Sequence, residues 1–246
     1  MPTTTWERLP ESRRDAVLTA AEDEFAEHGF SRGSLNVIAR NAGVSKGSLF
    51  QYFDDKVDLF DHLVERASGR VGAVMDAAAA ELDWKAGFFP AFTAMLDCWM
   101  DYFADNPRDR SLTVRASLEA DPQTRGAVTD EVDRRHLRFI RPRLVAAQAD
   151  GWLRADADLD AFESLLLLML PHLAMEPGLR TVDPVFGTGE RSADRAGVRR
   201  LVAVFEDAFG SRPTVGASST APRQTRPGRT QPGQARPGRA RPGGRS

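Results

Sequence analysis

The chain has 246 residues, a formal net charge of −2 and one cysteine, Cys98. This length allows one small and one medium domain, and a single cysteine excludes an internal disulfide. The longest apolar run, residues 165–170, is far too short to span a bilayer, which excludes a membrane-spanning protein. Residues 1–12 are polar and lack the apolar segment of a signal peptide, so we expect a cytoplasmic protein.

Positive charge is concentrated at the C-terminal end. Residues 211–246 hold eight arginines and no acidic residue, so residues 1–210 carry a formal charge of −10. Residues 1–60 hold seven lysines and arginines against ten aspartates and glutamates. Nucleic-acid binding therefore cannot be inferred from bulk charge. It needs a motif with cations placed locally, for which the candidates are Arg32, Arg40, Lys46 and Lys56.

The apolar spacing predicts an all-α fold, because no segment alternates with the two-residue period of a strand. The first helix is expected over residues 10–28, with Pro10 at its first position and Gly29 at its C-terminal cap. Its inward stripe consists of Val17, Leu18, Ala21 and Phe25.

Two short helices follow. Ser34 is placed to cap a helix over residues 35–41, and Ser45 is placed to cap a second helix that ends near Phe53. Gly43, in the turn between them, is free to take a positive φ. Helices this short are not stable alone, so each must pack against something larger. Two short helices joined at a glycine turn form a helix-turn-helix, which places its second helix in a DNA major groove.

This stretch closely resembles the DNA-binding domain of the TetR family of bacterial repressors. The family pattern begins with an aromatic residue and a Gly-aromatic pair, followed by Ile-Ala, Gly-Val-Ser, a small-Leu-aromatic run, Phe and Lys. The matching residues here are Phe25, Gly29, Phe30, Ile38, Ala39, Gly43, Val44, Ser45, Gly47, Ser48, Leu49, Phe50, Phe53 and Lys56. They cover about a fifth of the chain. The resemblance implies a three-helix DNA-binding domain followed by a helical domain that binds a ligand and dimerises.

Helical geometry predicts which side of the second short helix meets DNA. Leu49 and Phe53, four residues apart, are expected to face the domain core with Ile38 and Val44. The outward residues are then Lys46, Gly47, Ser48, Gln51 and Tyr52.

These outward residues suit different contacts. Gln51 can make two hydrogen bonds to adenine, and Lys46 can reach guanine or a phosphate. Gly47 exposes bare backbone and allows close approach. Ser34 and Ser45, at helix N-termini, suit phosphate oxygens.

The resemblance adds three further positions. Lys56 matches the family's phosphate-binding lysine, and Asn36 matches a position that can reach bases from the preceding helix. Phe50 stands where the family usually has tyrosine, so a hydroxyl contact to phosphate is missing there, and Tyr52 could supply one instead.

After a DNA-binding domain over residues 1–56, residues 57–210 are expected to form a second, helical domain. The expected helices are 57–82, 86–104, 108–120, 122–149, 159–176 and 192–209. Pro142 and Pro171 are expected to kink the helices that contain them. The Pro- and Gly-rich stretch over residues 176–190 is expected to be a mobile loop.

The helix over residues 86–104 is unusually aromatic. Phe92, Met95, Trp99 and Phe103 share one of its faces, which fits either a packed core or the wall of an apolar ligand pocket. The polar candidates for such a pocket are Arg115, Glu119, His136 and His172, with Phe139 on the same helix as His136. Either histidine alone is better explained as a hydrogen-bonded structural or surface residue.

No catalytic or metal-binding pattern stands out. His28, His62, His136 and His172 lack the HxxH or HxxxH spacing, and Cys98 lies alone among aromatic residues. We therefore expect no enzyme, no cofactor and no metal. A membrane-associated or adaptor protein would leave the Gly-Val-Ser motif unexplained.

We predict a ligand-responsive transcription regulator, a repressor that binds a palindromic operator as a homodimer. A small apolar or amphipathic effector would release it from DNA. Dimerisation is expected on the last two helices, about residues 159–175 and 193–209. Their apolar residues are Phe162, Leu165, Leu166, Met169, Val198, Leu201, Val202 and Phe205.

The segment over residues 211–246 is of low complexity, and we expect it to be disordered because it lacks the apolar residues of a core. Two interpretations stay open. The segment is either a polycationic arm that adds non-specific phosphate affinity, or a neutral extension without function.

Overall fold

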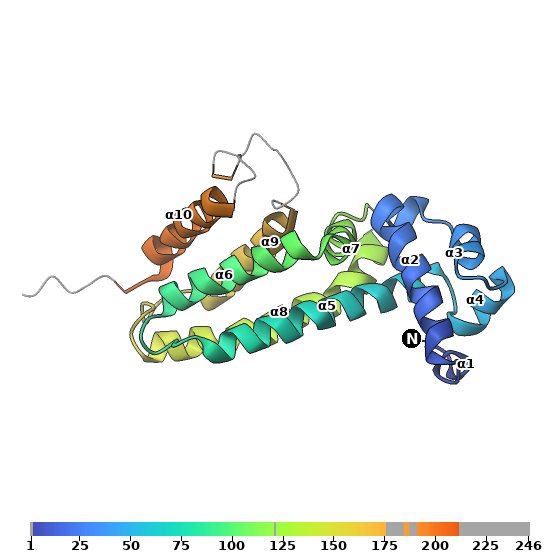
Figure 1. Ribbon diagram of the computed structural model, residues 1–246. Coiled ribbons are helices and arrows are strands. Elements are labelled where there is room, and N and C mark those ends of the chain that lie inside the picture. Colours follow the sequence, from blue (N-terminus) through green and yellow to red (C-terminus); the bar gives the residue numbers. More distant parts are fainter. Residues whose placement is uncertain (1, 121, 176–184, 187–190, 212–246) are drawn as a thin grey trace, which may run out of the picture. The chain divides into compact units, whose positions relative to one another are not determined.

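The computed structural model describes residues 2–120, 122–175, 185–186 and 191–211 (Figure 1). These residues are largely α-helical and contain no β-strand, which confirms the all-α class, and one isolated bridge pairs Leu153 with Gly210. None of the described helices combines the length and the apolar character needed to cross a membrane. The helices are α1 (Thr4–Glu7), α2 (Glu11–Arg32), α3 (Leu35–Asn41), α4 (Lys46–Tyr52), α5 (Lys56–Glu81), α6 (Phe88–Asp105), α7 (Pro107–Ser117), α8 (Pro122–Ala149), α9 (Leu159–Met175) and α10 (Arg191–Phe209).

Two predicted segments lie mainly outside the described residues. Of the expected tail only Ser211 is described, and of the loop over residues 176–190 only Val185 and Phe186. Phe186 is buried against α10, where a Cβ atom on Gly197 would lie 2.5 Å from its ring. Glycine at position 197 is therefore required for this packing.

The helix boundaries mostly follow the prediction. α5, α6, α8, α9 and α10 begin and end within two residues of the expected positions, and Pro142 and Pro171 lie inside α8 and α9. α7 ends at Ser117, earlier than expected. α2 continues to Arg32, because Gly29 kinks the helix (φ 72°, ψ 178°) instead of ending it.

The two predicted serine caps differ. The Ser45 hydroxyl accepts a hydrogen bond from the backbone N of Ser48 at 3.0 Å, which confirms the cap on α4. Ser34 precedes α3 but its side chain makes no capping hydrogen bond, so that prediction is wrong. Instead, the backbone N of Ser34 donates to the buried carboxylate of Glu24 at 2.9 Å.

Helix α1 is too short to show any periodicity, and the sequence does not predict it. It matters because it holds the end of α4. The Trp6 ring lies 4.9 Å from Phe53 and 5.8 Å from Tyr52, measured between ring centroids. The Thr3 backbone N donates to the carbonyl of Tyr52 at 3.0 Å, and the Thr3 hydroxyl donates to the carbonyl of Gln51 at 2.6 Å.

The residues predicted to face the core of the helix-turn-helix are buried, except Val44, which is half-buried against the same cluster. The predicted stripe on α2, together with Ile38, Ala39, Leu49 and Phe53, joins one hydrophobic cluster. That cluster continues into α5 and α7 through Leu59, Phe60, Leu63, Leu112 and Ala116. It therefore crosses residue 56, and the division into domains at that residue stays a prediction.

Polar contacts add to the hydrophobic packing between α7, α2 and α5. Arg70 of α5 pairs with Asp109 of α7 and with Glu22 of α2 at 3.2 Å. Tyr102 of α6 donates its hydroxyl to Asp109, a carboxylate that is only 5% exposed. Both hydrogen bonding to Asp109 and its negative charge raise the pKa of Arg70, so this arginine stays charged.

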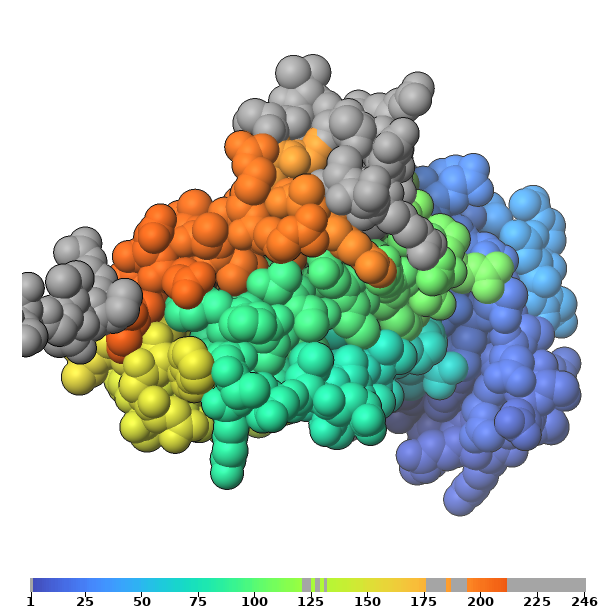
Figure 2. All heavy atoms as spheres, turned by 60° about the vertical axis from the view of Figure 1, so that its left-hand side comes forward, coloured from blue at the N-terminus to red at the C-terminus, as the bar shows by residue number. Residues whose placement is uncertain are grey.

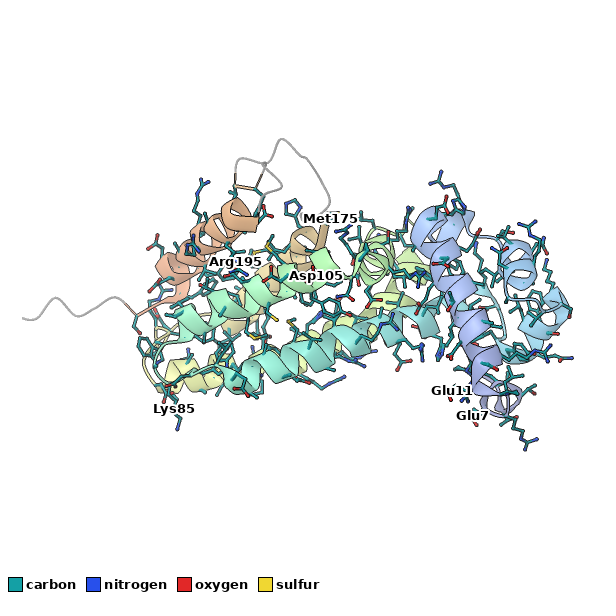
Figure 3. All side chains as sticks on the ribbon, in the orientation of Figure 1. Glu7, Glu11, Lys85, Asp105, Met175 and Arg195 are labelled. Atoms are coloured by element: carbon teal, nitrogen blue, oxygen red, sulfur yellow. The ribbon has the colours of Figure 1, made fainter. Side chains whose placement is uncertain are left out.

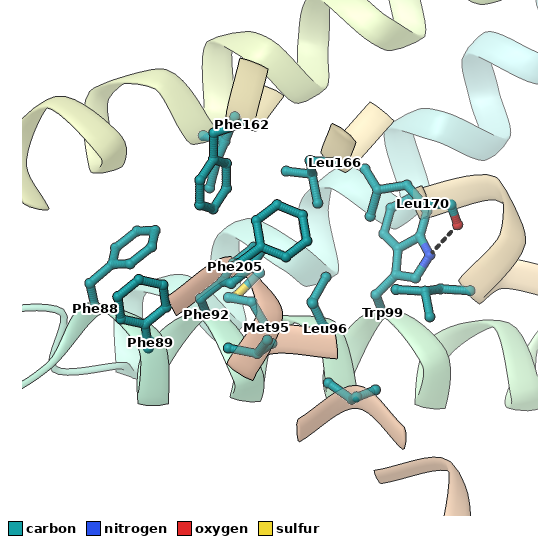
Figure 4. Packing of buried hydrophobic residues seen from close by; sticks show 14 of the residues in the cluster. Phe88, Phe89, Phe92, Met95, Leu96, Trp99, Phe162, Leu166, Leu170 and Phe205 are labelled. Carbon is teal, nitrogen blue, oxygen red and sulfur yellow. Dashed lines mark hydrogen bonds between the residues drawn. The ribbon is translucent and has the colours of Figure 1, made fainter. Parts of the chain in front are cut away.

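A second hydrophobic cluster is built from α5, α6, α8, α9 and α10. Figure 4 shows its centre, where Phe88, Phe92 and Trp99 of α6 lie near Phe162 and Leu170 of α9. Helix α10 lies over α6 in both overall views, drawn in orange over green (Figures 1 and 2). Arg195 of α10, labelled in Figure 3, forms an ion pair with Asp101 of α6 at 2.7 Å.

Removing the Trp6 ring should destabilise the helix-turn-helix. Trp6 is 5% exposed, and replacing a buried tryptophan by alanine typically costs about 3–5 kcal/mol. We expect Trp6→Ala to lower the free energy of unfolding by about 3 kcal/mol in a denaturant titration. Trp152→Ala is the matched control, since Trp152 is 37% exposed and should cost about 1 kcal/mol or less. Equal losses in the two variants would contradict the packing role of α1.

The two serines allow a second comparison. Ser45→Ala removes an N-cap hydrogen bond and should cost about 1 kcal/mol of stability. Ser34→Ala removes no such bond and should cost less than about 0.5 kcal/mol. Thermal unfolding of both variants measures the difference, and a Ser34→Ala loss at least as large as that of Ser45→Ala would refute the assignment of the caps.

Candidate DNA-binding surface and internal cavity

The exposed side of α4 carries most of the residues predicted to meet DNA. Lys46, Gly47, Phe50 and Gln51 are exposed on α4, and Asn36 is exposed on α3. Together with Ser45 they form what we call the α4 face. Gly47 is open, because a Cβ there would meet only the Ser45 hydroxyl, at 3.7 Å. No acidic residue occurs in α4, so the charge of Lys46 is not opposed within its own helix.

Ser48, in the first turn of α4, and Ser34, just before α3, are half-buried. The hydroxyl groups of Ser45 and Ser48 lie 2.8 Å apart and share a hydrogen bond. The Ser48 hydroxyl is therefore already used within the protein, and Ser34 is less accessible than Ser45.

Tyr52 does not face outward as predicted. It is 6% exposed and packs against Trp6. The reason is that Tyr52 follows Leu49 by three residues, which puts both side chains on the inner side of α4. Phe50 is instead the outward aromatic residue, at 48% exposure.

Lys56 begins α5 and lies beside the kinked end of α2. Its Nζ atom donates to the carbonyl of Ser31 at 3.4 Å and lies 4.7 Å from the centre of the Phe30 ring. Partial burial lowers the pKa of Lys56, against the opposing charges of Glu119 and Glu24. The ammonium group is thus held in place by protein contacts.

A cavity of about 270 Å³ lies between α5, α6, α8 and α9. Five predicted ligand residues line it, namely Phe92, Met95, Trp99, His136 and Phe139. Figure 4 shows Met95, Leu96 and Trp99 on one side and Leu166 and Leu170 on the other. Trp99 is fixed there, because its indole nitrogen donates to the carbonyl of Leu170 at 3.1 Å.

A smaller cavity of about 30 Å³ adjoins the first and has Phe103 in its wall. Both cavities share Ser68, Val71, Trp99, His136 and Leu170. The smaller cavity is also lined by Thr113, Ala116 and Ser117 of α7. A molecule in the cavities would therefore touch the helix that contacts α2.

Two predicted ligand residues lie elsewhere. Arg115 donates to the carbonyls of Ala26 and Glu27 at 2.8 and 2.6 Å and so binds the end of α2. His172 is exposed, because Leu170 and Leu173 take the inward positions of α9 and leave position 172 on the outer side. Neither residue lines the two cavities. Glu119 accepts a hydrogen bond from Ser31 at 2.9 Å and is likewise absent from the lining.

The cavity has polar residues that the sequence did not reveal. They are Ser68, Asp76, Arg135 and Arg138. Charged residues on a long helix are usually on a solvated face, so Arg135 and Arg138 gave no signal of their own. In the sequence, only His136 and Phe139, one helical turn apart, pointed to this part of α8 as cavity lining.

His136 is the most deeply buried titratable group of the cavity. Its ring lies 5.3 Å from that of Trp99 in an edge-on arrangement. Burial, together with the charge of Arg135, lowers the pKa of His136 to about 4, so the imidazole is neutral at pH 7. A neutral imidazole both donates and accepts one hydrogen bond. Among the described residues, no cluster of His, Cys, Asp and Glu forms a metal-binding group.

Comparison with known proteins agrees with the helix-turn-helix. Residues 17–63 match the family model of bacterial regulatory proteins, tetR family. The transcriptional repressor BepR of Brucella suis is 43% identical over 54 residues, which cover 22% of this chain and 26% of BepR. The transcriptional activator FasR of Mycolicibacterium smegmatis is 26% identical over 175 residues, covering 62% of this chain and 78% of FasR.

Among solved structures, the fold resembles that of the transcriptional regulator FadR from Bacillus subtilis, determined in complex with stearoyl-CoA. The TM-score is 0.63 at 16% identity, covering 76% of this chain and 96% of FadR. This likeness concerns the fold, whereas the family model and the sequence relatives identify the DNA-binding segment. Residues 17–63 therefore carry the DNA-binding segment of the TetR family of bacterial regulatory proteins.

Proposed function

We propose that this protein is a ligand-responsive transcription repressor that binds a palindromic operator as a homodimer. The observation that carries the proposal is the α4 face, where Lys46, Gly47 and Gln51 are exposed on a helix capped by Ser45. This face supplies a hydrogen-bonding side chain, a cation and open backbone side by side. These groups serve to read and bind DNA, and they lack the paired acid and base of a catalytic site.

In this proposal α4 enters the major groove, which is about 12 Å wide and admits an α-helix. Gln51 reads adenine, and Lys46 reads guanine or binds phosphate. Phe50 can contact a thymine methyl group, which compensates for the hydroxyl that a tyrosine would have offered. Ser34, Ser45, Ser48, Asn36 and Lys56 are proposed to contact the backbone or flanking bases.

A homodimer supplies the two copies of α4 that a palindromic site needs. α9 and α10 remain our candidates for its interface, but only part of their apolar faces is available. Phe162, Leu166, Val198, Val202 and Phe205 are buried within the protein's own core. Leu165, Leu168 and Val204 are exposed at 48%, 78% and 64%, and large exposed apolar residues of this kind suit a subunit interface.

The cavity is proposed to hold the effector. Its volume lies just below the range of about 300–1,000 Å³ typical of small-molecule sites, and its lining is mainly aromatic and aliphatic. FadR of Bacillus subtilis, similar in fold, was solved with stearoyl-CoA, which supports an apolar or amphipathic ligand. Such a ligand would press on α7, and α7 in turn holds α2 through Ser111 and Arg115. Movement of α2 changes the separation of the two α4 helices and so releases DNA.

The proposed DNA contacts predict that two variants lose DNA affinity in different ways. Gln51→Ala should weaken binding to the operator by about 1–3 kcal/mol and leave random DNA almost unaffected. Lys56→Ala should weaken operator and random DNA together, because it removes a phosphate contact. Gel shifts with the DNA upstream of the protein's own gene measure both. Lys85→Ala, an exposed lysine between α5 and α6, is the control and should bind as the parent protein does. The roles are wrongly assigned if Gln51→Ala loses both kinds of DNA equally.

Charged substitutions in the proposed dimer interface should halve the mass of the particle in solution. Leu168→Arg combined with Val204→Arg places charges on exposed apolar positions and should give monomers in light scattering, with unchanged helix content. Phe205 is unsuitable for this test, because it lies in the core and its replacement would unfold the protein. Val145→Arg on α8, where Val145 is 51% exposed, is the matched control and should stay dimeric. A dimeric double variant would move the interface away from α9 and α10.

A further inference from the structure

Arg135 of α8 packs against α5. Two glycines of α5, one turn apart, make room for it. A Cβ on Gly69 would lie 3.5 Å from the Nη1 atom of Arg135, and one on Gly72 would lie 3.7 Å from the same atom. Those are ordinary van der Waals distances, so the side chain of Arg135 lies directly against α5 at both glycines. The glycines thus keep the charged end of Arg135 against the helix and at the cavity wall.

Arg135 has no protein partner among the described residues. Other arginines of the same helices are paired: Arg70 binds Asp109, and Arg141 binds Asp160 at 2.7 Å and Glu163 at 3.0 Å. The charge of Arg135 instead acts on His136, whose pKa it helps to lower. Arg135 thus lines a mainly apolar cavity without an ion pair to a described residue, and a bound anion would supply one.

The other polar groups that line the cavity also favour a negatively charged ligand. Among the described residues that line it, Arg138 is a second cation and Asp76 is a carboxylate, and Asp133 lines the adjoining smaller cavity. The charge of Asp76 acts on Arg143, which lies over the rings of Phe139 and Trp84. His136 makes no hydrogen bond with the described residues. It therefore offers the cavity a neutral hydrogen-bonding group beside the cation.

We infer that the effector is an amphipathic anion, an apolar chain that ends in a carboxylate bound by Arg135 and His136. This inference rests on the proposed role of the cavity as the effector site. The planar guanidinium matches a carboxylate with two parallel hydrogen bonds, and such charge-assisted bonds are about twice as strong as neutral ones. The chain lies along Phe92, Met95 and Trp99, so it is held by burial of its apolar surface.

Calorimetric titration of the full-length protein with matched ligands tests the inference. Decanoate, decanol and decylamine share a chain and differ in charge, and the octyl and dodecyl series repeat the comparison. We expect the carboxylate to bind at least about tenfold more tightly than the alcohol or the amine. Arg135→Gln should weaken decanoate binding about 10- to 100-fold, as a lost hydrogen bond to a charged group does, and leave decanol within about twofold.

Arg134→Gln is the matched control, since Arg134 is the neighbouring, exposed arginine of α8 and does not line the cavity. It should bind all three ligands as the parent protein does. Equal affinity for acid and alcohol, tighter binding of the amine, or no binding of any carboxylate overturns the inference. The parent protein's preference decides even if Arg135→Gln does not fold. DNA takes no part in these titrations, so failure of the gel shifts would count against the proposed function alone.

Discussion

The kink in α2 at Gly29 determines which contacts hold the helix-turn-helix in place. Gly29 has a positive φ, which breaks the regular hydrogen bonding of the helix and leaves carbonyls near its end in need of donors. Ser111 and Arg115 of α7 supply them at Ala26 and Glu27. The positive φ favours glycine at position 29, and a Cβ there would lie 3.2 Å from Nη1 of Arg115, which leaves little room for a side chain.

These hydrogen bonds connect residues that lie 85 to 89 positions apart in the sequence. α7 donates hydrogen bonds to α2 on one side and lines the smaller cavity on the other. The carboxylate of Asp109 adds a second attachment, to Arg70 of α5, which the hydroxyl of Tyr102 reinforces. Because a well-packed interior shifts between discrete arrangements and does not deform smoothly, filling the cavity would act on α2 through α7 as a unit.

The parts that the sequence predicted correctly depend on local signals. The positive φ of Gly43, the Ser45 cap and the burial of Leu49 follow from spacing within a few residues. The long helices follow from periodicity. The errors arise where a distant segment decides. The inner side of α4, which includes Tyr52, packs on Trp6 of α1, a helix that the sequence does not predict, and Arg115 lies outside the two cavities because it donates to carbonyls of α2. Arg135 was missed because its setting depends on two glycines of another helix.

Charge explains why such small movements would matter for DNA binding. Residues 1–210 carry a formal charge of −10, so long-range attraction to phosphate contributes little and can even oppose approach. Within residues 1–210, the affinity for DNA that we propose must then come from direct contacts of the few groups on the α4 face, and the eight arginines of residues 211–246 are the other source of positive charge. Short-range hydrogen bonds are lost within about an ångström of displacement, whereas a strongly basic surface would tolerate it. A folded region that is acidic overall is therefore well suited to a switch in which the separation of two helices decides between bound and free DNA.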